Sequence, residues 1–179
     1  MTENQSVSLL VNGMAQNIIA ADDRGLLYGD GLFETIAFCT SQAPLWELHM
    51  QRLRTSCERL FLPMPEPELL AHECLRLVAG LTRAVVRITL TRGSGGQAYI
   101  PPENPKLNRI LMRRTYPTIS DGVSMIRSGI ELDGSDVLSG IKHLNRLEQV
   151  LIGRECRQLN AGEALVCDRQ GYVVEGLSS

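Results

Sequence analysis

The chain has 179 residues, which is long enough for one full domain or for one small domain and part of a second. Hydrophobic residues make up 44% and charged residues 21%, a composition that is ordinary for a globular protein. Eighteen basic and 20 acidic residues leave a formal net charge of −2, which disfavours a nucleic-acid-binding or membrane-surface protein, because both need concentrated positive charge.

Two further absences narrow the class of protein. No apolar run approaches the roughly 20 residues of a membrane span, and the first residues lack the basic-then-apolar pattern of a secretory signal. The five cysteines are odd in number and scattered, and none forms a CxxC pair. We therefore expect reduced thiols in a cytoplasmic protein, with neither a disulfide framework nor a metal site.

The first forty residues predict a hairpin followed by a longer strand. The pair Asn12-Gly13 lies between two apolar stretches, the second at 18–20, and is typical of a tight hairpin turn. Glycines interrupt the next segment, and residues 32–38 then have the composition of a strand.

Helical spacing follows this strand. Apolar side chains recur at Met50, Leu53, Cys57 and Leu60, which predicts a helix over about 47–60. The further elements expected before residue 117, in chain order, are a helix over 67–79, a strand over 86–91, a long loop over 93–108 and a strand over 109–116.

The remaining residues predict a second, incomplete domain. The pattern Asn145-x-x-Glu148 resembles a capping box and predicts a helix that begins near Asn145. The order of strands, helices and strands predicts an α+β fold. It consists of a small N-terminal α/β domain over 1–117, followed by the first part of a larger β-rich domain with helices over 118–179. The strands expected in this second part are 123–130, 163–167 and 172–175.

Lys142 is the strongest candidate for a chemical role. Only two of the 18 basic residues are lysines, Lys106 and Lys142, and Lys142 lies just before the predicted helix. The partial positive charge of a helix N-terminus and the apolar neighbours would both lower the pKa of its amine. They would thereby favour a neutral nucleophile that forms an imine with a carbonyl. The alternative is an ordinary surface lysine near a helix start.

Two other residues have chemistry that would complement this amine. Glu175 ends an apolar strand, and a carboxylate in a cleft there would hold a proton on a heterocyclic nitrogen; the alternative is a solvent-exposed strand end. Arg52, on the first predicted helix, would bind a phosphate through its guanidinium; the alternative is a solvated helix face. The glycines at 93–96 lack the spacing of a nucleotide-binding loop and predict a flexible loop near a site.

Four segments together resemble a known family. They are DRGLLYGDGLFET (23–35), HMQRL (49–53), TRGSGG (91–96) and GIKHLNRLEQVL (140–151). The chain is similar, in consistent order along its whole length, to the aminodeoxychorismate lyase family. That family belongs to the class IV aminotransferase superfamily of pyridoxal 5′-phosphate (PLP) enzymes. The segment around Lys142 is the most specific part, because the branched-chain and D-amino-acid transaminases differ around their lysine.

The resemblance implies a role for each of the three candidates. Lys142 matches the lysine that binds PLP covalently and then moves protons. Arg52 matches the arginine that grips the cofactor phosphate, and Glu175 matches the acid that pairs with the pyridine nitrogen.

The resemblance also implies which residues meet the substrate. Phe33 and the loop 93–99, which carries Gln97 and Tyr99, match positions that line the pocket in relatives. Several relatives have a basic residue near position 97, where this chain has a neutral amide. Arg87, on the polar face of its strand, is therefore an alternative contact for a substrate carboxylate.

The implied reaction splits 4-amino-4-deoxychorismate into 4-aminobenzoate and pyruvate, a step towards folate, in a homodimer with active sites near the subunit interface. The alternatives are a transaminase of the same superfamily that acts on D-amino or branched-chain amino acids, and a non-catalytic remnant that only binds or dimerises. Family members continue well beyond the position of Ser179. We therefore expect this chain to expose a hairpin edge and apolar surface, and by itself to bind PLP weakly or not at all.

Overall fold

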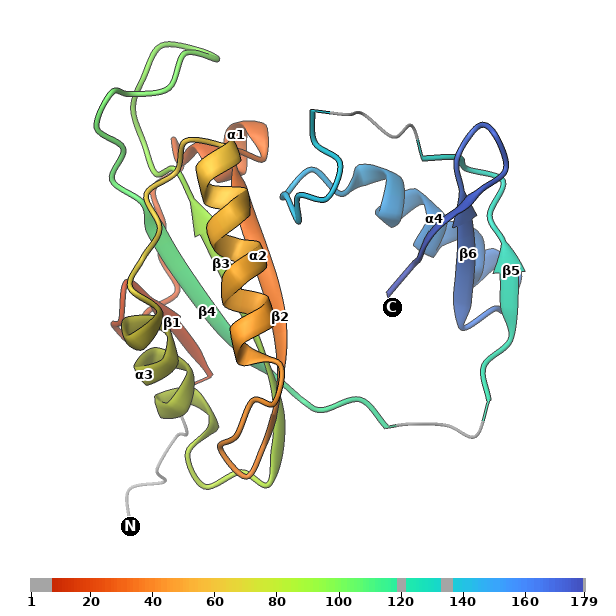
Figure 1. Ribbon diagram of the computed structural model, residues 1–179, viewed down its shortest axis with the longest axis horizontal. Helices are drawn as coiled ribbons and strands as arrows, with labels where there is room; N and C mark the ends of the chain where they lie inside the picture. Colours follow the sequence, from red (N-terminus) through yellow and green to blue (C-terminus); the bar gives the residue numbers. More distant parts are fainter. Residues whose placement is uncertain (1–7, 119–121, 133–136, 179) are drawn as a thin grey trace. The chain divides into compact units, whose positions relative to one another are not determined.

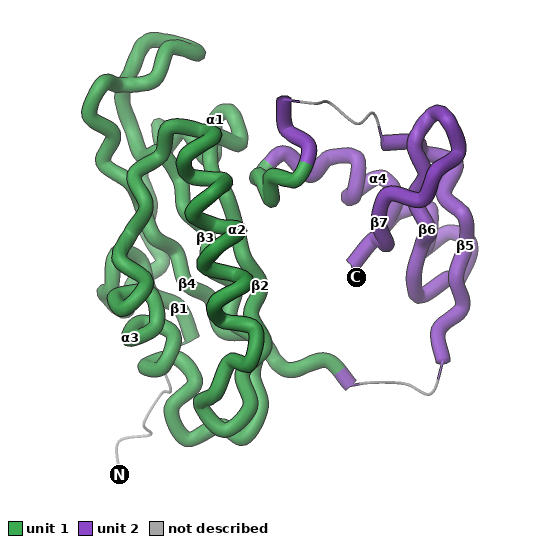
Figure 2. The backbone as a smooth tube through the Cα atoms, in the orientation of Figure 1, with its two compact units in different colours: residues 1–117, 140–144 green, residues 118–139, 145–179 purple. Residues whose placement is uncertain are grey.

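Two compact units make up the chain (Figure 2). Unit 1 consists of residues 1–117 and 140–144, and unit 2 of residues 118–139 and 145–179. The short segment 140–144 thus belongs to unit 1, although the chain on both sides of it belongs to unit 2. The computed structural model describes residues 8–118, 122–132 and 137–178. No helix within these ranges is long and apolar enough to cross a membrane.

An antiparallel sheet of four strands is the base of unit 1 (Figure 1). The longest pairing joins its strands β2 and β3, from Gly31 opposite Thr91 to Cys39 opposite Arg83. β2 lies at one edge of the sheet, so one side of its backbone remains open to pairing with another segment. In spatial order the strands are β1 (Leu9–Val11), β4 (Asn108–Arg114), β3 (Arg83–Thr91) and β2 (Gly31–Cys39), and the short helix α1 (Arg24–Tyr28) precedes β2.

Two helices, α2 (Trp46–Arg59) and α3 (Pro67–Val78), pack on this sheet and cover one of its faces (Figure 1). Met50, Leu53 and Cys57 of α2 are buried, as their helical spacing predicts. The buried side chains of the helices and of alternate strand residues form the core of unit 1.

Unit 2 contains a three-stranded sheet and one helix. Its central strand, β6, pairs parallel with β5 and antiparallel with β7. Tyr172 and Val173 are exposed, so the last hairpin presents apolar side chains to solvent, as expected from the sequence. The elements are β5 (Met125–Arg127), α4 (Leu147–Gln158), β6 (Glu163–Cys167) and β7 (Val173–Gly176). The core that joins α4 to β6 consists of Leu132, Ile152, Cys156, Ala164 and Val166.

The α+β class is confirmed, but the predicted N-terminal hairpin is wrong. The turn at Asn12 and Gly13 forms, yet β1 pairs with β4, and residues 18–20 form no strand. Leu10 lies opposite Leu111 and both are fully buried. Burial against the core therefore selects the partner of β1, which turn chemistry alone does not determine.

Two elements of unit 2 also differ from expectation. The strand expected over 123–130 is limited to the three residues of β5. The helix expected near Asn145 begins at Leu147, with Arg146 at the N-cap and no side-chain hydrogen bond to the cap. Residues 142–144 make backbone contacts with β2 instead, and this extended pairing delays the start of the helix.

Candidate active site

Lys142 lies on a segment that extends the sheet of unit 1 beyond its edge strand. The amide of Phe33 donates a hydrogen bond to the carbonyl of Lys142 over 2.9 Å, and the amide of Leu144 donates to the carbonyl of Gly31 over 3.0 Å. His143 forms an isolated antiparallel bridge with Leu32 between them. The backbone of Lys142 is therefore fixed to the edge of β2.

The side chain of Lys142 lies against an aromatic ring that also contacts a second cation. Its Nζ is 4.6 Å from the centroid of the Phe33 ring, and the guanidinium carbon of Arg87 is 3.7 Å from the same centroid. Phe33 is only 8% exposed, and Lys142 is half-buried. Partial removal of a lysine from water favours the neutral form in which its amine acts as a nucleophile.

The surroundings of Lys142 differ in one respect from those that the sequence predicted. Lys142 lies five residues before Leu147, the first residue of α4, so it is not in the position directly ahead of a helix that the sequence predicted. The nearby positive charge that the structure provides is the guanidinium of Arg87 instead.

Arg52 is held by a buried carboxylate on β2. Its Nε donates to Oε1 of Glu34 over 2.7 Å, and its Nη2 donates to Oε2 over 2.6 Å. The Nδ1 of His49 lies 2.8 Å from the same Oε2. Glu34 is 1% exposed, whereas Arg52 is 47% exposed. One edge of the Arg52 guanidinium is thus fixed by Glu34, and the rest of the group is open to solvent.

This pairing keeps both partners ionised. Burial alone would raise the pKa of Glu34, but the hydrogen bonds and charges of Arg52 and His49 outweigh it and hold that pKa below its ordinary value. The hydrogen bonds with Glu34 in turn raise the pKa of Arg52. Nη1 of Arg52 makes no hydrogen bond within the part of the chain that the structure describes, so it is the nitrogen available to an anion.

Lys142 and Arg52 therefore contact consecutive residues of one strand, Phe33 and Glu34. Side chains alternate between the faces of a strand, so Phe33 and Glu34 point to opposite faces of β2, and a ligand that meets both Lys142 and Arg52 would have to span the edge of this strand. Glu175, on β7, belongs to unit 2, where it is half-buried and accepts a hydrogen bond from Gln149.

Gln97 and Tyr99 lie on an exposed loop that a buried arginine holds. The guanidinium of Arg24, which is 4% exposed, donates to the carbonyls of Ala98 and Tyr99 over 2.7 and 3.2 Å. The side chain of Tyr99 is 82% exposed, and Gln97 is also exposed.

Asp30 connects this loop to the end of α2. Its Oδ2 accepts hydrogen bonds from Arg24 over 2.9 Å and from Arg92 over 2.8 Å. Arg92 also donates to the carbonyls of Leu60 and Phe61, which follow α2. Burial alone would raise the pKa of Asp30, but the two arginines lower it below its ordinary value.

The sequence analysis missed Glu34 and Asp30 as site residues. A signal for Glu34 was present, because it occupies a buried position between the apolar residues Leu32 and Ile36 of a strand. A carboxylate at such a position needs a charged partner, and His49 and Arg52 supply it from α2. No comparable sequence pattern pointed to Asp30.

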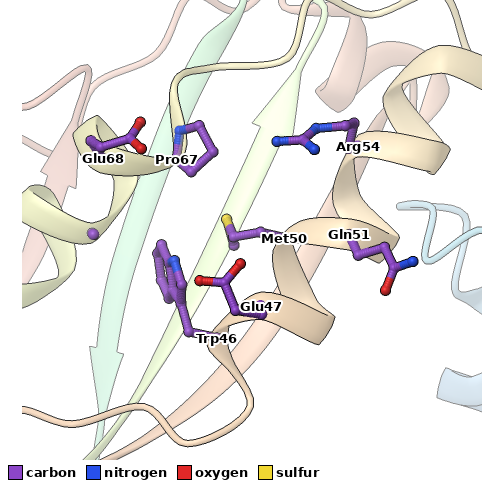
Figure 3. Close-up of a pocket in the computed structure, with 8 residues that line it drawn as sticks. Trp46, Glu47, Met50, Gln51, Arg54, Pro67 and Glu68 are labelled. Carbon is purple, nitrogen blue, oxygen red and sulfur yellow. The ribbon is translucent and has the colours of Figure 1, made fainter.

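A separate pocket of about 490 Å³ lies between α2 and α3 (Figure 3). None of the residues that the sequence predicted for the site lines it. Its lining residues are Trp46, Glu47, Met50, Gln51, Arg54, Pro67, Glu68 and Ala71.

Comparison with known proteins finds relatives over most of the chain. Residues 31–179 match the family described as amino-transferase class IV. The aminodeoxychorismate lyase of Vibrio harveyi is 29% identical over 176 residues, which cover 92% of this chain and 63% of the relative.

Two solved structures resemble the fold. The crystal structure of 4-amino-4-deoxychorismate lyase from Pseudomonas aeruginosa has a TM-score of 0.85 and 37% identity, over 94% of this chain and 64% of that chain. A hypothetical aminotransferase from Mycobacterium tuberculosis, in a PLP-bound form, has a TM-score of 0.75 and 25% identity, over 95% of this chain and 65% of that chain. The chain therefore spans less than two thirds of the length of all three proteins.

Proposed function

Because the chain belongs to the class IV aminotransferase family, we propose that it acts as a PLP-dependent aminodeoxychorismate lyase. The reaction is the conversion of 4-amino-4-deoxychorismate to 4-aminobenzoate and pyruvate in folate biosynthesis. Two lyases among the similar proteins support this choice of activity. The observation that carries the proposal is the amine of Lys142, held on the edge of β2 against Phe33 and beside Arg87.

The chemistry of the donor set fits PLP. Lys142 would hold the cofactor aldehyde covalently, Nη1 of Arg52 would bind its phosphate, and Glu175 would accept the N–H of its ring nitrogen. When bound, PLP delocalises the electrons that remain after a proton leaves the amine-bearing carbon of the substrate.

Residues of the chain would transfer the proton and hold the phosphate in position. The amine of Lys142 would take the proton from the amine-bearing carbon of the substrate. Glu34 fixes the plane of the Arg52 guanidinium, so that the phosphate is held in one orientation. The C–O bond between the ring and the enolpyruvyl group would then break and the ring would become aromatic, while the departing enol would take up the proton held by Lys142 and become pyruvate.

Arg87 is the proposed partner of a substrate carboxylate. Its guanidinium lies on the same ring as the amine of Lys142, so it would place a carboxylate beside the reacting carbon. Gln97 and Tyr99 would add polar contacts from the loop that Arg24 holds. We propose that the working form is a cytoplasmic homodimer.

Reductive trapping tests the proposed role of Lys142. The chain is incubated with PLP and treated with borohydride, and the labelled residue is located by mass spectrometry. Because the chain has only two lysines, Lys106→Ala is a matched control for Lys142→Ala. We expect the label on Lys142, retained in Lys106→Ala and lost in Lys142→Ala. Equal labelling of both lysines would contradict the proposal. Covalent trapping with borohydride detects even a weakly bound cofactor.

The second candidate function is a transaminase of the same family. The similarity to the hypothetical aminotransferase from Mycobacterium tuberculosis favours keeping it. The two activities are separated by supplying amino donors with 2-oxo acids, and separately 4-amino-4-deoxychorismate. Release of 4-aminobenzoate and pyruvate is expected of the lyase, whereas amino transfer without that release would identify the transaminase.

A further inference from the structure

Gln149 and Glu175 form a hydrogen bond inside unit 2. The Nε2 of Gln149 donates to Oε1 of Glu175 over 2.9 Å. Gln149 is the third residue of α4, and Glu175 lies on β7 opposite Val166, next to a register shift between Val166 and Cys167. The contact therefore joins the first turn of the helix to the strand that carries the proposed partner of the ring nitrogen.

The direction of the amide is set by its partner. A carboxylate only accepts hydrogen bonds, so Nε2 and not Oε1 of Gln149 faces Glu175. Oε1 of Gln149 is thereby buried, and no donor among the described residues reaches it. An unpaired buried acceptor lowers stability, so packing alone would favour an apolar side chain of the same length at this position. The presence of an amide at position 149 is therefore better explained by its hydrogen bond to Glu175 than by a contribution to the stability of the fold.

A neutral donor suits a carboxylate that must remain charged. One hydrogen bond fixes Oε1 of Glu175, while Oε2 accepts none from the described residues. An arginine at position 149 would add a positive charge that competes with a pyridinium for the carboxylate, whereas an amide does not.

We propose that Gln149 is a positioning residue, which holds the carboxylate of Glu175 so that Oε2 receives the N–H of a protonated pyridine ring. The inference rests on the function proposed above and adds to it a residue that touches no reacting atom.

The test measures the PLP concentration that gives half-maximal reductive labelling of Lys142. Gln149→Met keeps the side-chain length and removes the donor. We expect this concentration to rise about threefold to tenfold, because Glu175 keeps its charge and loses only the hydrogen bond that orients it. Gln158→Met makes the same change at the exposed end of α4 and should leave the value unchanged. Glu175→Gln, measured in parallel, should raise it further.

Two further measurements distinguish a role of Gln149 in orienting Glu175 from a role in packing alone. The unfolding temperature of the cofactor-free Gln149→Met chain should equal or exceed that of the unchanged chain, because a buried unpaired acceptor is removed. The nitrogen NMR signal of ring-labelled PLP should report less protonated ring nitrogen in Gln149→Met. A lower unfolding temperature with an unchanged ring signal would overturn the inference in favour of a packing role.

The outcomes for the inference and for the proposed function are distinguishable. If no PLP concentration labels Lys142 more than Lys106 in the unchanged chain, the proposed function fails and the inference fails with it. If Glu175→Gln raises the half-maximal concentration and Gln149→Met does not, the inference alone fails.

Discussion

Glu34 shows how one buried charge can organise two neighbours. Both of its carboxylate oxygens are used, one by Arg52 and the other by Arg52 and His49 together. Because Glu34 has almost no access to water, its charge depends on these partners. The orientation of Arg52, and with it the proposed phosphate contact, therefore depends on a residue that would not touch the cofactor.

Replacing Glu34 by Gln should destabilise the chain by about 1 to 2 kcal/mol at neutral pH, since half-exposed Arg52 is partly solvated when its charged partner is lost. The pKa of Glu34 is lowered on folding from its ordinary value of 4.5. Its stabilising contribution is therefore complete above that value and is lost as pH falls through the lower folded pKa. The difference between the two chains, measured by urea unfolding, should shrink in acid.

Glu68→Gln, at an exposed position of α3, is the control and should change stability by less than about 0.5 kcal/mol. A difference between Glu34→Gln and the unchanged chain that grows as the pH falls would contradict the assigned pairing.

At the scale of single residues, the sequence pointed to candidate residues but not to the residues that they contact. Few lysines and an apolar neighbourhood pointed to Lys142, and a helical position pointed to Arg52. The partners of these residues, Phe33 with Arg87 and Glu34 with His49, come from strands and helices brought together only by the tertiary fold. Local spacing therefore contains no information about them.

At the scale of elements, the edge of β2 is the feature that positions the candidate nucleophile. Gly31 begins this strand where it is paired with β3 on one side and with the 140–144 segment on the other. A Cβ on Gly31 would lie 2.2 Å from the carbonyl oxygen of Leu90 and 2.8 Å from Cδ1 of Leu144. Only glycine allows both neighbours to approach so closely.

Gly31→Ala should therefore lower the stability of the chain by about 1 to 3 kcal/mol and loosen the 140–144 segment. Hydrogen exchange measures the second effect, because the amides of Phe33 and Leu144 make the hydrogen bonds that join this segment to β2. Both should lose protection. Gly122→Ala, where a Cβ meets no atom within 4 Å, should leave both amides protected. Equal protection in the two variants would argue against this pairing.

The elements that the sequence predicted well are those with a strong internal period. The spacing of Met50, Leu53 and Cys57 predicted α2 to within a residue or two. The start of α4 was misplaced because backbone pairing with β2 overrides the capping preference of Asn145. The partner of β1 was misassigned because short strands are selected by burial over long sequence separations.

At the scale of the whole molecule, each unit has its own buried core. Ile152 is fully buried in the core of unit 2, and Ile36 is fully buried in unit 1. Because Ile152 and Ile36 lie in different compact units, damage to one core should remain local.

Ile152→Ala should lower stability by about 2 to 5 kcal/mol within unit 2. Hydrogen exchange should then accelerate at Ala164 and Val166 of β6 while Val86 and Ile88 of β3 stay protected. Ile36→Ala makes the same chemical change in the other unit and should give the reverse pattern. Uniform acceleration in both variants would instead mean that the chain unfolds as one cooperative body.

The return of residues 140–144 to unit 1 makes that unit discontinuous in sequence. A fragment ending at residue 117 would contain the sheet, α2 and Arg52, but would lack the strand-like segment that carries Lys142. The missing segment is held by main-chain hydrogen bonds to an edge strand, the same bonds by which sheets capture free peptides. The proposed nucleophile is thus separable in principle from the sheet that holds it, which makes the chain a natural starting point for a split protein reconstituted by adding a short lysine-bearing peptide.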